Sequence, residues 1–261
     1  RINDVVYLDP SNPDRAFSLN PFEVTNEAQK ELVVSGILSI FTKVWAGVWS
    51  ARMEYILRNV LLSVVEMPDA TMLMVPEMLA NPKFRAKVVD RINDPILRSF
   101  WTNEFDNYTD RLRAEAVAPI QNKVGQFLAS TKIRNILQSP KSTIDIAKIM
   151  DEGKILLLNL SQGKLGEDNA ALLGAMMITK IQLAAMNRVY QKEEDRRDFY
   201  LYVDEFQNFA TTSFIKILSE ARKYRLSLTL ANQYIAQIEE DVRAAIFGNA
   251  GTMLSFIVGA T

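Results

Sequence analysis

The chain has 261 residues, of which 48% are hydrophobic and 23% charged, and its formal net charge is -1. This composition excludes a disordered or fibrous chain, and the length suits one large domain or one domain with a sizeable insertion. Cys and His are both absent, which excludes disulfides, zinc sites of the usual ligand set and Ser-His-Asp catalysis. Catalysis would therefore depend on carboxylates, Lys, Arg, Ser or Thr.

The sequence predicts a soluble, cytoplasmic segment without membrane contact of its own. No apolar run reaches the roughly 18 to 20 residues that a membrane span needs, and the first residues lack the layout of a signal peptide. Because the sequence begins at Arg1 without Met, we expect an excised segment with further sequence upstream. The near-zero net charge means that a nucleic-acid contact would come from a local patch or from a pore built by several subunits.

The first 139 residues predict one strand and then a helical unit. Residues 1–26 contain a β-branched apolar run closed by Asp9-Pro10, which predicts a buried strand that ends in a turn. From 27 to 139 the apolar residues recur at helical spacing. We therefore expect an all-helical insertion there, and the residues that first set its spacing are Leu32, Ile37, Leu38, Phe41, Trp45 and Trp49.

Residues 140–261 predict an α/β unit. Apolar runs at 154–160, 199–204, 226–231 and 252–258 have the length of strands, and helical patterns at 167–191, 211–224 and 239–247 separate them. Such alternation predicts a mostly parallel sheet flanked by helices, in which ligands bind beyond the carboxyl ends of the strands. The polar residues that follow the predicted strands are Asp9, Asn159, Asp204, Glu205, Asn232 and Gln233.

Two adjacent carboxylates, Asp204 and Glu205, follow the predicted strand at 199–204. In a nucleotide hydrolase, an Asp at this position would hold the water shell of Mg²⁺, and the following Glu would deprotonate the attacking water. An exposed turn with no chemical role is the alternative. Gln233 could contact a γ-phosphate, or Asn232 could cap a helix beside a solvated Gln233. Arg222 could act as an arginine finger, or could only complement a helix dipole.

The chain resembles the HerA/TraG/TraD-type P-loop ATPases, which include the coupling proteins of type IV secretion and conjugation. The resemblance is carried by YLYVDEFQNFATTSFIKILSEARKYRLSLTLANQYIAQI at 200–238, with LSEARKY and ANQYIAQ as its more specific parts. NDVVYLDPSNPDRAFSLNPF at 3–22 and GKILLLNLSQGKLGEDNAALLGAMMITKIQLAA at 153–185 extend it. The resemblance implies a RecA-like fold, with residues 140–261 as the later part of the ATPase core, including the Walker B and sensor strands.

The resemblance also implies a function, which is ATP-driven movement of DNA through a homo-hexameric ring. By this analogy Asp204 assists Mg²⁺, Glu205 is the catalytic base, Gln233 contacts the γ-phosphate, and Arg222 acts on the nucleotide of a neighbouring subunit. A relaxase or another secretion-system component is the implied protein partner. The intact protein would be anchored at the inner membrane if membrane spans precede this segment.

One departure from the family pattern concerns the phosphate-binding loop. No G-x-x-x-x-G-K-[ST] run occurs in the sequence, and 161–166, which contains Gly163-Lys164, is expected to be a surface loop. We expect the phosphate loop upstream, so the 261 residues alone should neither bind ATP tightly nor hydrolyse it.

Two alternative functions remain open: a non-catalytic RecA-like ring subunit or adaptor, and a related DNA-packaging ATPase. A modest excess of basic residues between 83 and 134 either faces DNA phosphates or solvates helices.

Overall fold

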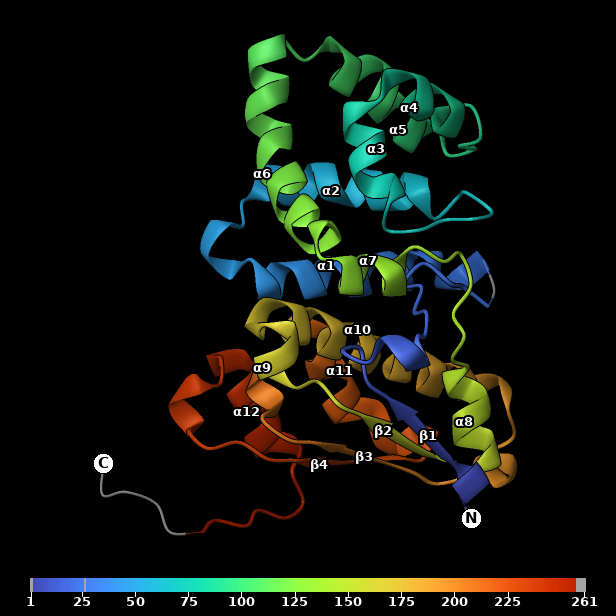
Figure 1. The fold of residues 1–261 in the computed structure, drawn as a ribbon, viewed down its shortest axis with the longest axis vertical. Helices are drawn as coiled ribbons and strands as arrows, with labels where there is room; N and C mark the ends of the chain where they lie inside the picture. The colour runs from blue at the N-terminus through green and yellow to red at the C-terminus, as the bar shows by residue number, and fades with distance from the viewer. Residues whose placement is uncertain (1, 26, 257–261) are drawn as a thin grey trace.

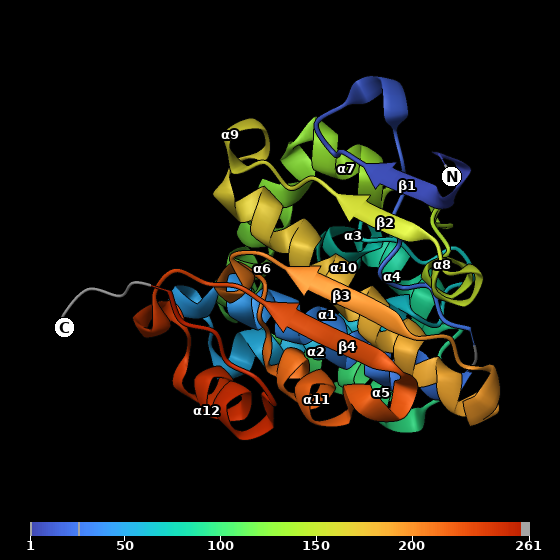
Figure 2. The same cartoon turned by 90° about the horizontal axis from the view of Figure 1, so that it is seen from below.

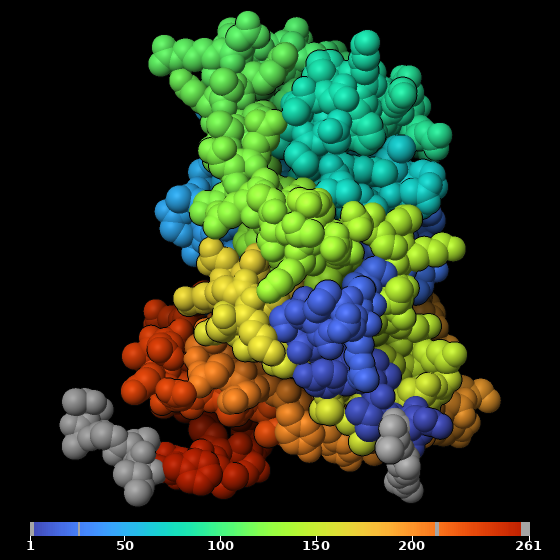
Figure 3. Space-filling model, viewed as in Figure 1, coloured from blue at the N-terminus to red at the C-terminus, as the bar shows by residue number. Residues whose placement is uncertain are grey.

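The computed structural model describes residues 2–25 and 27–256. A helical part is stacked on an α/β part, and the chain enters and leaves the helical part through two adjacent segments (Figure 1). In the space-filling view the blue N-terminal segment lies against the yellow-green segment that returns from the helical part (Figure 3). The two ends of the helical excursion are therefore held together on one side of the molecule.

The described residues between 27 and 139 form helices and no strand, in keeping with the helical spacing of their apolar residues. Side chains that accept backbone N–H bonds begin four of these helices, and the capping residues are Ser50, Asn81, Asp94 and Thr109. The helices are α1 (Lys30–Val44), α2 (Ala51–Val64), α3 (Met74–Ala80), α4 (Pro82–Val89), α5 (Pro95–Ser99), α6 (Asp110–Ala129) and α7 (Thr131–Leu137), with a π-helical turn at Phe100–Glu104.

The α/β part contains two pairs of parallel strands. β1 (Val5–Leu8) pairs with β2 (Ile155–Leu158), and β3 (Phe199–Val203) pairs with β4 (Leu226–Leu230). All four strands run in the same direction, but no hydrogen-bonded pairing joins β2 to β3 (Figure 2). The helices of this part are α8 (Ile146–Glu152), α9 (Gln162–Leu165), α10 (Glu167–Asn187), α11 (Thr212–Glu220) and α12 (Glu240–Asn249).

Three local predictions differ from the structure. Residues 162–165, expected in a loop, form the single turn of α9, and the helix predicted at 211–224 ends at Glu220 before a 3-10 turn, Ala221–Tyr224. The strand predicted at 252–258 is not formed by residues 252–256, and 257 and 258 lie outside the described residues. A strand needs a hydrogen-bonding neighbour, which local sequence cannot supply.

Helices cover only one face of the strands. α10 and α11 lie against that face with α1 beyond them, whereas the view in Figure 2 looks directly onto the strands from the other side. Alternating side chains on the uncovered face are exposed, and Tyr202 is the most exposed of them at 72%. The apolar side chains on this face are Val5, Tyr7, Ile155, Leu157, Tyr200 and Tyr202. Alternation of this kind fits strands with one packed face. The run closed by Asp9-Pro10 was predicted to form a buried strand, and this is wrong for Val5 and Tyr7 of β1, because the helices pack on the other face.

α10 is the central helix of the α/β part. Extended by its last 3-10 turn to Glu167–Tyr190, it is the one segment among the described residues that is long and apolar enough to cross a membrane. No such segment was expected from the sequence. Because 67% of its apolar window is buried inside the structure, packing between α1 and the strands accounts for its composition.

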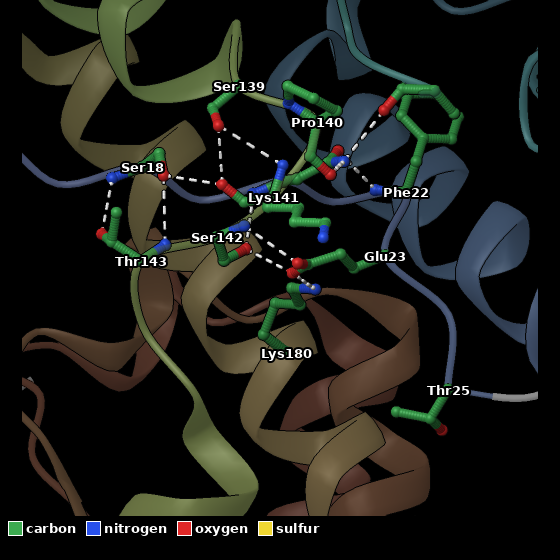
Figure 4. Close-up of polar contacts among 12 residues, drawn as sticks. Ser18, Phe22, Glu23, Thr25, Ser139, Pro140, Lys141, Ser142, Thr143 and Lys180 are labelled. Carbon is green, nitrogen blue, oxygen red and sulfur yellow. Dashed lines mark hydrogen bonds and ion pairs between the residues drawn. The ribbon is translucent and has the colours of Figure 1, made fainter. Parts of the chain in front are cut away.

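Side-chain hydrogen bonds join the two segments that connect the parts (Figure 4). The backbone N–H of Ser18 donates to Thr143 Oγ1 at 3.0 Å, and that of Asn20 donates to Ser142 Oγ at 2.8 Å. The side-chain amide of Asn20 donates to the carbonyls of Pro140, at 2.7 Å, and Ala70, at 2.9 Å. Asn20 therefore ties both connecting segments to the loop after α2.

Glu23 extends this joint to α10. Its carboxylate accepts hydrogen bonds from the backbone N–H and the hydroxyl of Ser142, and it pairs with Lys180 of α10 at 3.2 Å. Burial acts to raise the pKa of Glu23, but the Ser142 bonds and the Lys180 ammonium outweigh it, so the pKa lies below the ordinary 4.5. The ionised form of Glu23 is thus stabilised by folding.

Glu23 should make the free energy of unfolding depend on pH. Because the folded-state pKa of Glu23 is lowered, its contribution is present above about pH 4.5 and is lost as the pH falls through the folded value. We expect Glu23→Gln to reduce the loss of unfolding free energy between neutral and acidic pH, measured by urea titration at a series of pH values. Glu193→Gln, at an exposed position, should leave that loss unchanged. An identical acid response in the wild type and Glu23→Gln would contradict this role.

Candidate nucleotide site at the ends of β3 and β4

The candidate site forms where β3 and β4 end side by side. In the parallel register Val203 lies opposite Leu230, and the pairing continues one residue further, because the Ala231 N–H donates to the Val203 carbonyl at 2.9 Å. The Phe206 N–H in turn donates to the Ala231 carbonyl at 3.1 Å. The residues after both strands therefore share one edge, as expected for carboxyl ends of parallel strands.

The backbone turns sharply at Glu205. Its φ of 49° and ψ of 43° lie in the left-handed region, which costs a non-glycine residue about 1 kcal/mol or more. The turn ends the strand and begins the 3-10 turn Phe206–Asn208. The Glu205 N–H donates to Asp204 Oδ1 at 3.0 Å, so the two acidic residues are held in a fixed relation. Asp204 is exposed and Glu205 is half-buried.

The Glu205 carboxylate is clamped between two side-chain amides. Gln233 Nε2 donates to Oε1 at 2.6 Å, and Gln207 Nε2 donates to Oε2 at 2.6 Å. The structure thus brings together Glu205 and Gln233, two residues that the sequence analysis selected. Gln207, and Gln237 beyond it, were missed. The only sequence signal for them was position, since Gln207 follows the acidic pair by two residues and Gln237 ends the ANQYIAQ run.

Asp204 and Glu205 offer a limited set of ligands for a metal ion. Within residues 2–25 and 27–256, no group of three acidic side chains gathers at one point. Mg²⁺ does not need such a group, because it keeps several waters and is held by one or two carboxylates together with the phosphates of the substrate. The exposed carboxylate of Asp204, fixed by the turn at Glu205, fits this mode of binding through water.

Arg222 does not join the acidic site of its own chain. It lies in the 3-10 turn directly before β4, and the Arg225 carbonyl accepts from Phe199, the first residue of β3. Arg222 is therefore at the amino ends of the two strands, while Glu205 follows the carboxyl end of β3. Its side chain is exposed. A role at the nucleotide would thus require a site from another subunit.

The polar residues that follow β1 and β2 also lie close together. Asn159, which follows β2, donates to the Tyr7 hydroxyl at 3.1 Å and to Asp9 Oδ2 at 3.4 Å. Hydrogen bonds from the hydroxyl and N–H of Ser11 hold the pKa of Asp9 below its ordinary 3.8. Asp9 and Asn159 therefore form a second polar pair at the same edge of the strands.

An open cleft of about 1550 Å³ separates β2 from β3. Apolar side chains of α10, among them Met177 and Ile178, form part of its wall. Its polar end contains the carboxylates and amides of the candidate site together with Asn159, and these residues are Asp204, Glu205, Gln207, Gln233, Gln237 and Asn159. The acidic tip of β3 thus faces a space large enough for a ligand.

Comparison with known proteins gives one family match and a set of solved structures with a similar fold. Residues 198–260 match the family described as the TraM recognition site of TraD and TraG. That segment includes β3, β4, Asp204, Glu205, Arg222 and Gln233. No curated protein sequence matches the chain.

Solved structures of the bacterial conjugative coupling protein TrwB have the same fold. An unbound form aligns with a TM-score of 0.60 at 14% identity, over 95% of this chain and 56% of TrwB. TrwB in complex with ADP and Mg²⁺ aligns with a TM-score of 0.59 at 14% identity, over 95% and 57% of the two chains. The present chain therefore spans little more than half the length of these structures.

Together the comparisons support the resemblance to TraG/TraD-type coupling proteins. The family segment covers β3, β4 and the site, and the fold of TrwB covers nearly the whole chain. Outside 198–260, the likeness to coupling proteins is thus one of fold alone.

Close packing against α10 holds the loop that follows Glu205. A Cβ atom on Gly174 of α10 would lie 2.2 Å from Phe209 Cδ1 and 2.9 Å from Leu160 Cδ1. Gly174→Ala should therefore lower the free energy of unfolding by roughly 1–3 kcal/mol, partly offset by the better helix propensity of Ala. Gly125→Ala is the matched control in α6, because no described atom outside its own stretch of helix lies within 4 Å of its added Cβ.

Chemical denaturation of the two variants checks this prediction. Gly125→Ala should raise the free energy of unfolding by about 0.5–1 kcal/mol, since only helix propensity changes there. A similar increase in the free energy of unfolding for Gly174→Ala would show that Phe209 moves freely. Close packing against α10 would then not hold the loop.

Proposed function

We propose that the chain is part of a motor that couples ATP hydrolysis to the movement of DNA in conjugation or type IV secretion. The observation that supports this most directly is the meeting of Glu205 and Gln233, 2.6 Å apart, at the edge shared by β3 and β4. A carboxylate base beside an uncharged amide suits a water that attacks a γ-phosphate. The family match and the TrwB complex with ADP and Mg²⁺ support the choice of a nucleotide.

In this proposal each side chain has one task. Glu205 accepts the proton of the attacking water, Gln233 holds Glu205 and contacts the γ-phosphate, and Asp204 orients waters of the Mg²⁺ shell. Bound Mg²⁺ would neutralise charge on the phosphates. No phosphate-binding motif occurs in these 261 residues. The phosphate-binding loop would therefore come from another part of the intact protein.

The assembly proposed is a homo-hexameric ring in the cytoplasm. Arg222 is exposed at the strand edge opposite Glu205, which suits a guanidinium that reaches the nucleotide of the next subunit. DNA would pass through the ring and meet basic side chains there. The match to a TraM recognition site supports contact with a TraM-type protein. A relaxase or another secretion-system component is the further partner of this proposal.

Glu205→Gln tests the assignment of the base. In the intact protein this change should abolish DNA-stimulated ATP hydrolysis, a loss of about a hundredfold or more, because an amide cannot accept the proton. ATP binding should persist, since the shape of the side chain is kept. Hydrolysis is measured as phosphate release, and binding by titration with a fluorescent ATP analogue.

Glu193→Gln, at an exposed position in the linker before β3, is the control and should hydrolyse ATP at the wild-type rate. Undiminished hydrolysis by Glu205→Gln would refute the base. A wild-type protein that binds DNA but never hydrolyses ATP would favour a non-catalytic ring subunit instead.

Arg222→Ala tests action across subunits. The variant should lose ATP hydrolysis by about tenfold or more, as expected for an arginine finger, whereas Lys223→Ala, its exposed neighbour, should retain it. Mixed with Glu205→Gln, the Arg222→Ala protein should regain part of the activity. In such rings one subunit type supplies Glu205 and the other supplies Arg222. Mixing two inactive variants without any recovery would argue against a shared site.

A further inference from the structure

We infer that Gln207 is a positioning residue for the base Glu205, and that it couples Glu205 to Gln237 of the segment after β4. This inference rests on the proposed function, because it assigns Gln207 a role in the same hydrolytic site. The evidence is a continuous chain of side chains. Gln233 and Gln207 each donate to one oxygen of Glu205 at 2.6 Å, and Gln207 Nε2 lies 3.3 Å from Gln237 Oε1.

The orientation of the Gln207 amide follows from its partners. Both Glu205 Oε2 and Gln237 Oε1 are acceptors, so the group between them must be the NH₂ end of Gln207. A flipped amide would place its oxygen against the carboxylate. With one amide on each oxygen, the Glu205 carboxylate has a fixed plane, and the lone pairs that remain define where a water can donate.

Burial makes the polar character of Gln207 unusual. The residue is only 8% exposed, and no described residue forms a hydrogen bond with its Oε1. A buried acceptor without a partner costs about 1–3 kcal/mol. Leu would fill the same volume without that cost. A Gln at this position is therefore explained by its effect on Glu205 rather than by stability.

Gln237 adds a link to the neighbouring segment. It ends the 3-10 turn Ile235–Gln237, four residues after Gln233, and it is exposed. A displacement of this turn would pull on Gln207 and thereby rotate the Glu205 carboxylate. The geometry of the base therefore responds to the position of the segment that follows β4.

The test compares stability with catalysis in the intact protein. Gln207→Leu should lower kcat for ATP by about ten- to a hundredfold, the value of a hydrogen bond to a charged group, while KM for ATP and the free energy of unfolding do not fall. Gln191→Leu is the matched control, because Gln191 Nε2 donates to the Asp151 carboxylate at 2.9 Å far from the site. It should leave kcat unchanged.

A pH profile separates positioning from packing. Gln207→Glu places a second carboxylate beside Glu205, and repulsion between like charges favours protonation, so the acidic limb of the kcat profile should move to higher pH. Gln191→Glu makes the same change beside Asp151 and should not move that limb. A structural role alone would lower stability in Gln207→Leu and would leave the limb in place.

Each outcome distinguishes this inference from the proposed function. If Glu205→Gln is inactive but Gln207→Leu keeps the wild-type kcat, the inference is wrong and the proposed base stands. If kcat of Gln207→Leu falls only together with stability, and the acidic limb of Gln207→Glu stays in place, Gln207 is a packing residue and the inference is again wrong. If Glu205→Gln itself retains turnover, the proposed function fails and the inference fails with it.

Discussion

The candidate nucleotide site is organised around one carboxylate, that of Glu205. The left-handed backbone at this residue ends β3 and directs the chain into the turn that contains Gln207. The parallel register with β4 places Gln233 within 2.6 Å of the same carboxylate. A left-handed Glu is costly, and such strain is retained where the surrounding structure fixes it, often at functional sites. Pairing of β3 with β4 and the two amides provide that fixation here.

The rest of the α/β part supports this arrangement through α10. This helix is buried between α1 and the strands, its Gly174 allows Phe209 to approach closely, and its Lys180 pairs with Glu23 at the joint. The helical part is thus connected to the same helix that lines the cleft beside Glu205. The joint therefore contacts α10 directly through the pair of Glu23 and Lys180.

The polar strand ends could be predicted from the sequence for a general reason. Apolar runs identified the strands, and the carboxyl ends of parallel strands share one edge, so Asp204, Glu205 and Gln233 were expected together. Arg222 was expected near a nucleotide by resemblance alone, and the structure places it at the opposite ends of the strands. Its assignment therefore still depends on a second subunit.

Other features depend on contacts that local sequence does not specify. Gln207 acquires its role only because Glu205 adopts a left-handed conformation, and Gln237 approaches it across a sequence separation of 30 residues. The Ser18 and Thr143 bonds of the joint span 125 residues. Residues 252–256 have strand-like composition but no paired neighbour in the described chain. α9 is a single turn between Ser161 and Gly166, too short for a periodic signal.

A structure of the intact protein with Mg²⁺ and a non-hydrolysable ATP analogue would test the role of Glu205 most directly. We predict the γ-phosphate at the edge shared by β3 and β4, with Gln233 in hydrogen-bonding contact and a water held between the phosphate and Glu205. A nucleotide bound elsewhere, or a Glu205 carboxylate turned away from the phosphate with its amide partners lost, would contradict it.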